Sequence, residues 1–146
     1  VERAAKATPE QVAARHREYE LSAKVLPMLR DAGIPILAGT DAGYLNSFNY
    51  PGQALHDELQ RYVEAGLTPA QALASATITG PAFLGHTDRY GAVAEGKAAD
   101  LLILDANPLE DISATRGIHA VIVKGQLLDR AALDQLVAEA KARAAR

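Results

Sequence analysis

A short apolar run between glycines is the feature that most limits the folds open to this chain. The run extends from Ile34 to Ala38, and Gly33 and Gly39 stand at its two ends. Strands covered on both faces favour such continuous apolar stretches, whereas strands with one wet face alternate apolar and polar residues. We therefore expect residues 34–38 to form a buried parallel strand, which requires neighbouring strands and helices on both faces.

Helical patterns flank this run on both sides. Thr8–Gln11 and Thr68–Gln71 each combine a threonine N-cap, a proline at the first helical position and a glutamine three residues after the cap. We expect the first helix to kink or split at Pro27, because proline removes one backbone hydrogen bond. The helix after the apolar run should end at Gly66, and the helix that begins at Thr68 should be interrupted at Gly80-Pro81. The apolar stripe of the middle helix comprises Leu55, Leu59, Tyr62 and Val63.

The pattern changes near Tyr90, where glycines begin to punctuate short apolar runs. Leu101–Leu104 and Ala120–Val123 read as strands, and Lys124-Gly125 is typical of a hairpin turn into a third strand. A final helix is expected from Arg130 onward. Helix, strand, helix, helix in the first part of the chain is typical of one edge of a β/α barrel.

Composition excludes several classes of function. The net charge of −3 disfavours nucleic acid and anionic membranes as partners. The chain has no cysteine, so any metal site must use His, Asp or Glu. No run approaches the roughly 20 apolar residues that cross a bilayer. We therefore expect a cytoplasmic protein by default, unless an upstream signal has been lost.

Asp41 is the strongest candidate for chemistry. It follows the predicted strand within Gly39–Gly43, and the carboxyl ends of barrel strands carry catalytic groups. The alternative is that Asp41 only caps a turn. His56, near the start of the next helix, could lie on the same side and form a second-shell hydrogen bond, although a lone helical histidine is more often structural.

The loop after Asp41 offers aromatic candidates for substrate binding. Tyr44, Phe48 and Tyr50 could form walls of a substrate pocket, or could equally pack the loop onto the fold. Asp57 and Glu58 are adjacent in a helix and point in different directions, so we assign them to solvent or to a structural hydrogen bond.

Several motifs in succession resemble the amidohydrolase superfamily, in its imidazolonepropionase-like and prolidase-like branch. The motifs are Gly39-Thr40-Asp41-Ala42-Gly43, His56-Asp57-Glu58-Leu59, Val63-Glu64-Ala65-Gly66-Leu67-Thr68-Pro69, Gly91-Ala92-Val93, Gly96-Lys97-Ala98-Ala99-Asp100-Leu101 and Asp105-Ala106-Asn107-Pro108-Leu109-Glu110-Asp111-Ile112. Together they extend over most of the chain from about Gly33 to Arg130.

The resemblance implies an α/β fold that is the C-terminal portion of a TIM-type β/α barrel. Residues 1–89 would form its last strand and helices, 90–129 part of a small flanking β-sandwich, and 130–146 a C-terminal helix. Asp41 would be a metal ligand and proton shuttle in the hydrolysis of an amide, cyclic amide or dipeptide. The cofactor would be one or two divalent ions, with zinc as the default.

The chain also departs from the family pattern. The family's paired histidines, its middle-strand lysine or glutamate and its further histidines have no counterpart here, whereas a catalytic zinc site usually has three protein ligands. We expect the isolated chain to be inactive and its partner to be the remainder of the barrel. The alternative is a non-catalytic α/β module that associates through an exposed barrel edge, with a homo-oligomer expected. A site assembled from several copies would have to draw on His16, His86 or His119, which no motif supports.

Overall fold

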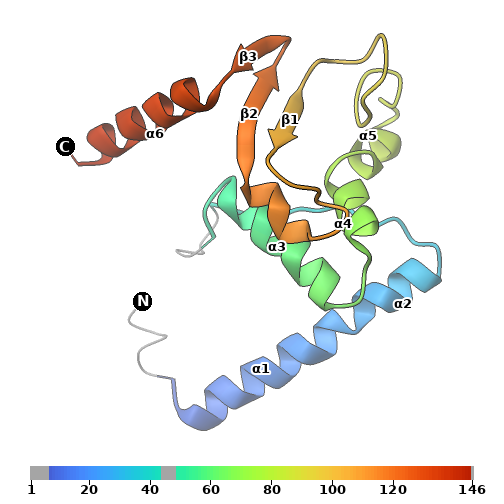
Figure 1. Ribbon diagram of the computed structural model, residues 1–146. Helices are drawn as coiled ribbons and strands as arrows, with labels where there is room; N and C mark the ends of the chain where they lie inside the picture. Colours follow the sequence, from blue (N-terminus) through green and yellow to red (C-terminus); the bar gives the residue numbers. More distant parts are fainter. Residues whose placement is uncertain (1–6, 44–48, 146) are drawn as a thin grey trace.

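The computed structural model describes residues 7–43 and 49–145, and it is a mixed helix and strand structure (Figure 1). In Figure 1, α3 and α4 lie between the long α1 and a three-stranded sheet, and α6 projects from the sheet toward the C-terminus. The mixed helical and strand composition that was predicted is confirmed, while the barrel that would surround it stays a prediction. In chain order the elements are α1 (Pro9–Ala23), α2 (Val25–Asp31), α3 (Gln53–Glu64), α4 (Pro69–Ala76), α5 (Thr79–Leu84), β1 (Leu101–Leu104), η2 (Ile112–Arg116), β2 (Ile118–Val123), β3 (Gln126–Leu128) and α6 (Arg130–Ala144).

Two prolines split the helical segments, each four residues beyond the break. A helical proline ring collides with the carbonyl of the residue four positions earlier. For Pro27 that residue is Ala23, where α1 ends, so the predicted split is confirmed. For Pro81 it is Thr77, the C-cap of α4, so the interruption lies before Gly80-Pro81 and not at it as expected.

The predicted helix caps are present. Thr8 and Thr68 both form complete capping boxes with the glutamine three residues later. After α3, Gly66 has φ 105°, and the amides of Gly66 and Leu67 donate to the carbonyls of Val63 and Tyr62. This is the Schellman arrangement that a left-handed glycine allows.

The expected buried strand at 34–38 is not formed among the residues that the structure describes. This segment has no strand pairing, and the side chains of Ile34 and Leu37 are 49% and 41% exposed. A strand exists only through hydrogen bonds to a neighbouring strand. Within residues 7–43 and 49–145 every strand belongs to the separate sheet β1-β2-β3, so the apolar run has no strand beside it.

That sheet is antiparallel throughout and follows the strands expected after Tyr90. β1 pairs with β2, and β2 pairs with β3 through the turn Lys124-Gly125. Both turn residues have positive φ, 51° and 80°, as a two-residue type I′ hairpin requires. The division of the chain at residues 89 and 129 stays a prediction.

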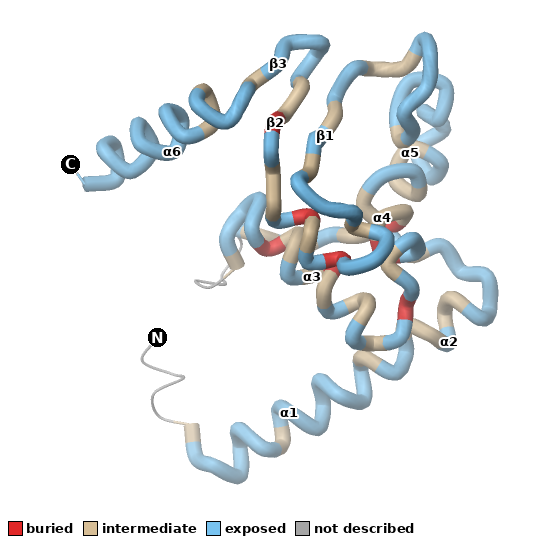
Figure 2. Tube along the Cα trace, in the orientation of Figure 1, coloured by how far each residue is buried: buried red, intermediate tan, exposed pale blue. Residues whose placement is uncertain are grey.

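The core is small and lies where α3, α4 and η2 meet (Figure 2). Leu59, Ala72 and Ile112 form its buried centre, with Tyr62 among the half-buried side chains packed around it. η2 therefore joins the region after Tyr90 to the helices before it. By contrast, α1 and α6 bury no residue, and no helix among the described residues has the length and apolarity to cross a membrane.

Candidate active site

Asp41 lies in a tight turn directly after the apolar run. Its backbone has φ 50°, in the left-handed region, and the residue is exposed. Non-glycine residues rarely adopt this conformation, although Asp and Asn tolerate it better than most. Such a conformation persists only when the surrounding structure holds it in place.

Three parts of the chain hold the backbone just before Asp41. The Ala38 amide donates to the Ser75 carbonyl of α4 over 3.0 Å. The Gly39 amide donates to Glu58 Oε1 of α3 over 2.9 Å, and the side-chain amide of Asn49 donates to the Thr40 carbonyl. The turn is therefore fixed by contacts from distant positions in the sequence.

Glu58 has a second donor on the same oxygen. The Tyr62 hydroxyl donates to Glu58 Oε1 over 2.5 Å, and burial, followed by the hydrogen bond to Glu58, raises the pKa of the Tyr62 phenol. The phenol therefore stays protonated and remains a donor. The other carboxylate oxygen, Glu58 Oε2, is buried without a hydrogen-bond partner among the described residues.

A hollow of about 550 Å³ lies beside this turn, next to α1 and α3. Most of its lining residues have polar side chains, and they include the adjacent carboxylates Asp57 and Glu58, which we assigned from the sequence to solvent or to a structural hydrogen bond. Asp41 is not among the lining residues. The lining comprises Tyr19, Gly39, Thr40, Asn49, Ala54, Asp57, Glu58 and Arg61.

The Asp57 and Glu58 side chains do point in different directions. Asp57 pairs with Arg116 over 2.5 Å on the surface, whereas Glu58 makes the structural hydrogen bonds described above. What the sequence did not reveal is that Glu58 reaches the turn of Asp41. The spacing of Glu58 and Tyr62, four residues apart on one helix face, is the signal that could have indicated their contact.

His56 contacts η2. Its Nδ1 lies 3.0 Å from the Thr115 hydroxyl, which itself donates to the Ile112 carbonyl over 2.9 Å. Because the hydroxyl proton is used in that way, Nδ1 carries the proton and donates to Thr115 Oγ1. The contact ties α3 to the region after Tyr90, and a second-shell role toward Asp41 stays a prediction.

The environment of His56 makes stability depend on pH. Burial, and then the charge of Arg116, lowers the pKa of His56 below its ordinary 6.5. Between the lowered pKa of the folded state and the ordinary pKa of the unfolded state, the unfolded chain binds a proton on His56 more readily than the folded chain does. The contribution of His56 to stability is therefore complete above about pH 6.5 and is lost as the pH falls through the folded-state pKa.

We expect His56→Gln to weaken this dependence. The wild-type midpoint of urea unfolding should fall between pH 7.5 and 5.5, and the variant's midpoint should fall less, because glutamine does not titrate. His16→Gln on exposed α1 serves as the control and should behave like wild type. Equal pH dependence in wild type and His56→Gln would contradict the assignment.

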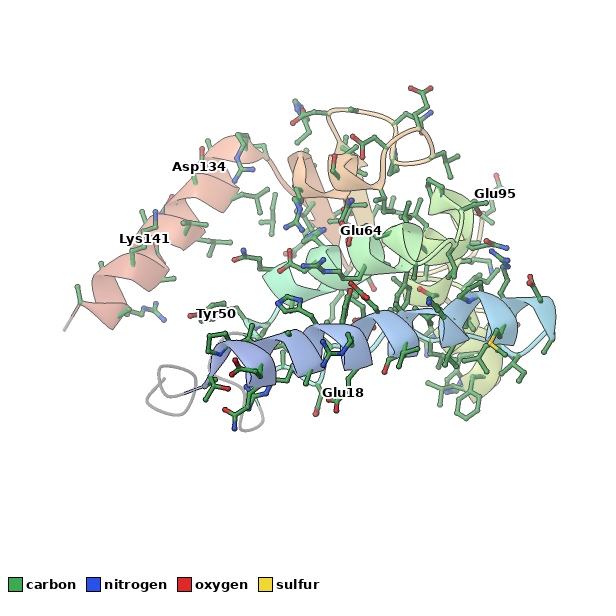
Figure 3. All side chains as sticks on the ribbon, turned by 90° about the horizontal axis from the view of Figure 1, so that it is seen from below. Glu18, Tyr50, Glu64, Glu95, Asp134 and Lys141 are labelled. Carbon is green, nitrogen blue, oxygen red and sulfur yellow. The ribbon has the colours of Figure 1, made fainter. Side chains whose placement is uncertain are left out.

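Of the aromatic candidates, only Tyr50 belongs to the described residues. It precedes α3, its side chain is 58% exposed, and it projects at the margin of the molecule (Figure 3). Tyr44 and Phe48 lie outside the described residues. The substrate-binding role of all three stays a prediction.

The donor set around Asp41 fits one ligand of a metal ion and no more. A carboxylate suits divalent cations, but within residues 7–43 and 49–145 no three His, Asp or Glu side chains lie close enough to hold one. His119 does lie beside a carboxylate, because its Nδ1 is 3.0 Å from Asp105 Oδ1. This pair belongs to the sheet region. The described chain alone therefore does not assemble a catalytic zinc site, which usually needs three protein ligands.

Comparison with known proteins finds one matching family and several relatives that match part of the chain. The model of the amidohydrolase family matches residues 8–128. The ochratoxinase of Aspergillus niger is 38% identical over 92 residues, which are 62% of this chain and 18% of that protein. The imidazolonepropionase of Thermoplasma volcanium is 29% identical over 91 residues, 62% of this chain and 22% of that protein. The chain thus spans about a fifth of the length of these relatives.

A solved structure supports the same relationship. The crystal structure of a Xaa-Pro dipeptidase with methionine bound in its active site superposes with a TM-score of 0.63 and 30% identity. The match covers 73% of this chain and 25% of the dipeptidase. The resemblance to the imidazolonepropionase-like and prolidase-like branch is confirmed.

Proposed function

Because the chain belongs to the amidohydrolase family, we propose that it is the C-terminal part of a metal-dependent hydrolase of carbon–nitrogen bonds, with Asp41 as metal ligand and proton shuttle. Members of this family are hydrolases that generally bind divalent metals. The observation that carries the proposal is the exposed Asp41 carboxylate on a left-handed turn that α3 and α4 hold in place.

Asp41 would move one proton in each catalytic cycle. A divalent cation, zinc by default, would supply Lewis acidity and lower the pKa of the attacking water when bound. The Asp41 carboxylate would accept a proton from the attacking water as the water oxygen bonds to the substrate carbonyl carbon. Asp41 would then give this proton to the nitrogen as the carbon–nitrogen bond breaks, which leaves a carboxylic acid and a neutral amine.

The remaining ligands would come from the remainder of the barrel, which is the partner we propose. The apolar run next to Asp41 supports this, because Ile34 and Leu37 expose side chains that suit a buried strand. Adjacent barrel strands would cover these side chains and supply the strand pairing that 34–38 lacks. Pairing of residues 34–38 with those barrel strands would also bring the missing ligands to the end of the segment where Asp41 lies.

The substrate would be a small amide, cyclic amide or dipeptide. The named relatives include a Xaa-Pro dipeptidase and an imidazolonepropionase, which supports a small molecule over a large polymer. Tyr50 stands exposed after the Asp41 turn, and together with Tyr44 and Phe48 it favours an apolar or aromatic substrate group.

The test is an assay of amine release from a panel of Xaa-Pro dipeptides, N-acyl amino acids and cyclic amides. The protein used should contain this chain together with the remainder of the barrel. Hydrolysis that depends on added divalent metal and on Asp41 supports the proposal. Self-association without hydrolysis of any amide would instead favour the non-catalytic module.

A further inference from the structure

We propose that Glu58 is a positioning residue for Asp41: its carboxylate holds the Gly39 amide and so fixes the turn from which Asp41 presents its own carboxylate. The inference rests on the proposed function of Asp41. It concerns a residue whose side chain lies on α3, nineteen positions from the amide that it binds.

The Asp41 turn needs an external restraint. Its left-handed backbone at a non-glycine residue is disfavoured, so the free segment would spend much of its time in other conformations. Gly39 lies two residues earlier. If its amide made no hydrogen bond, the backbone freedom of this glycine would let the turn change its orientation relative to α3. The hydrogen bond of 2.9 Å from the Gly39 amide to Glu58 Oε1 removes that freedom.

The restraint is anchored in the core. The Tyr62 hydroxyl donates to the same Oε1 over 2.5 Å, which fixes the rotamer of Glu58. Tyr62 packs against the buried cluster centred on Leu59. A continuous series of contacts thus runs from the core through Tyr62 and Glu58 to Gly39.

Packing alone does not account for a glutamate at this position. Glu58 Oε2 is buried without a hydrogen-bond partner among the described residues, and an unpaired buried carboxylate oxygen is destabilising. An apolar side chain of similar shape would avoid this cost. The Tyr62 hydroxyl also lies 3.4 Å from the Leu37 carbonyl, whereas the Gly39 amide donates to Glu58 Oε1. The position of that oxygen beside Gly39 is therefore the property that glutamate supplies.

Two substitutions separate reach from charge. Glu58→Asp keeps the carboxylate but shortens the side chain by one methylene, so it cannot span the distance to Gly39. Glu58→Gln keeps the reach and an acceptor oxygen but removes the charge. Glu64→Gln is the matched control, because Glu64 lies in the same helix and contacts Arg61 and Gln60 at the surface, away from Gly39.

Two readouts are measured for each variant. The first is hydrogen exchange of the Gly39 amide in the ¹⁵N-labelled chain, which reports the hydrogen bond itself. The second is the separation of kcat from KM in the complete hydrolase at saturating metal. We expect Glu58→Asp to speed Gly39 exchange and to lower kcat on the order of 10- to 100-fold with little change in KM. Glu58→Gln and Glu64→Gln should stay close to wild type in both.

Three outcomes would overturn the inference. They are wild-type kcat in Glu58→Asp, unchanged Gly39 exchange in that variant, and equal impairment of Glu58→Asp and Glu58→Gln, which would assign the requirement to charge. Asp41→Asn, assayed in parallel, keeps the two proposals apart. An inactive Asp41→Asn with a fully active Glu58→Asp overturns only the positioning role, whereas an active Asp41→Asn overturns the proposed function.

Discussion

Replacing Asp41 with asparagine is expected to lower the kcat of the complete hydrolase by about 10²- to 10⁴-fold, the usual contribution of a positioned general acid or base. Asparagine has nearly the same shape and tolerates the left-handed backbone at φ 50°, so the turn should be retained. The variant loses the anionic oxygen that would bind metal and the group that would carry the proton. The measurement is steady-state hydrolysis at saturating metal.

The control for this variant is Asp88→Asn, which makes the same chemical change at another exposed loop position. It should retain the wild-type kcat. Circular dichroism of both variants should match wild type, since neither removes a buried contact. A kcat within about threefold of wild type in Asp41→Asn would be far smaller than the loss expected for a lost proton shuttle and would reject the catalytic role.

The second large effect concerns stability. Leu59→Ala should lower the free energy of unfolding by about 2–5 kcal/mol, because it removes a buried side chain and leaves a cavity. Leu59 is 4% exposed and packs between Ala72 and Ile112, in a core that has few other buried apolar residues. Its loss should also loosen η2 from α3. Urea unfolding followed by circular dichroism measures the change.

Leu136→Ala is the matched control, because Leu136 is also a helical leucine but is 52% exposed on α6. Its free energy of unfolding should change by less than about 0.5 kcal/mol, as for most surface substitutions. If both leucine variants were destabilised equally, the core would not lie at the junction of α3, α4 and η2.

Local features of the fold could be predicted from the sequence because each depends on a few neighbouring residues. The capping boxes at Thr8 and Thr68 and the hairpin turn at Lys124-Gly125 are of this kind. The interruption at Pro81 was predicted in the wrong place because the clash acts four residues before the proline. The strand at 34–38 depends on partners elsewhere, so its apolar composition alone could not produce it.

In the candidate site, too, local features could be predicted from the sequence and contacts between distant residues could not. Asp41 could be selected as a candidate because its type and its position after the apolar run are visible in the sequence, and its role stays a prediction. The Glu58 to Gly39 hydrogen bond and the His56 to Thr115 contact join residues 19 and 59 positions apart, and no local pattern indicates such pairs. Their identification required the structure.

The central claim is that Asp41 contributes one ligand to a site that the remainder of the barrel completes. Elemental mass spectrometry of the purified 146-residue chain after dialysis, with zinc supplied beforehand, tests it directly. We expect near-zero metal per chain, because a single carboxylate does not retain the ion. A stable content of about one or more ions per chain would mean that the chain assembles a full ligand set by itself, which would contradict the claim.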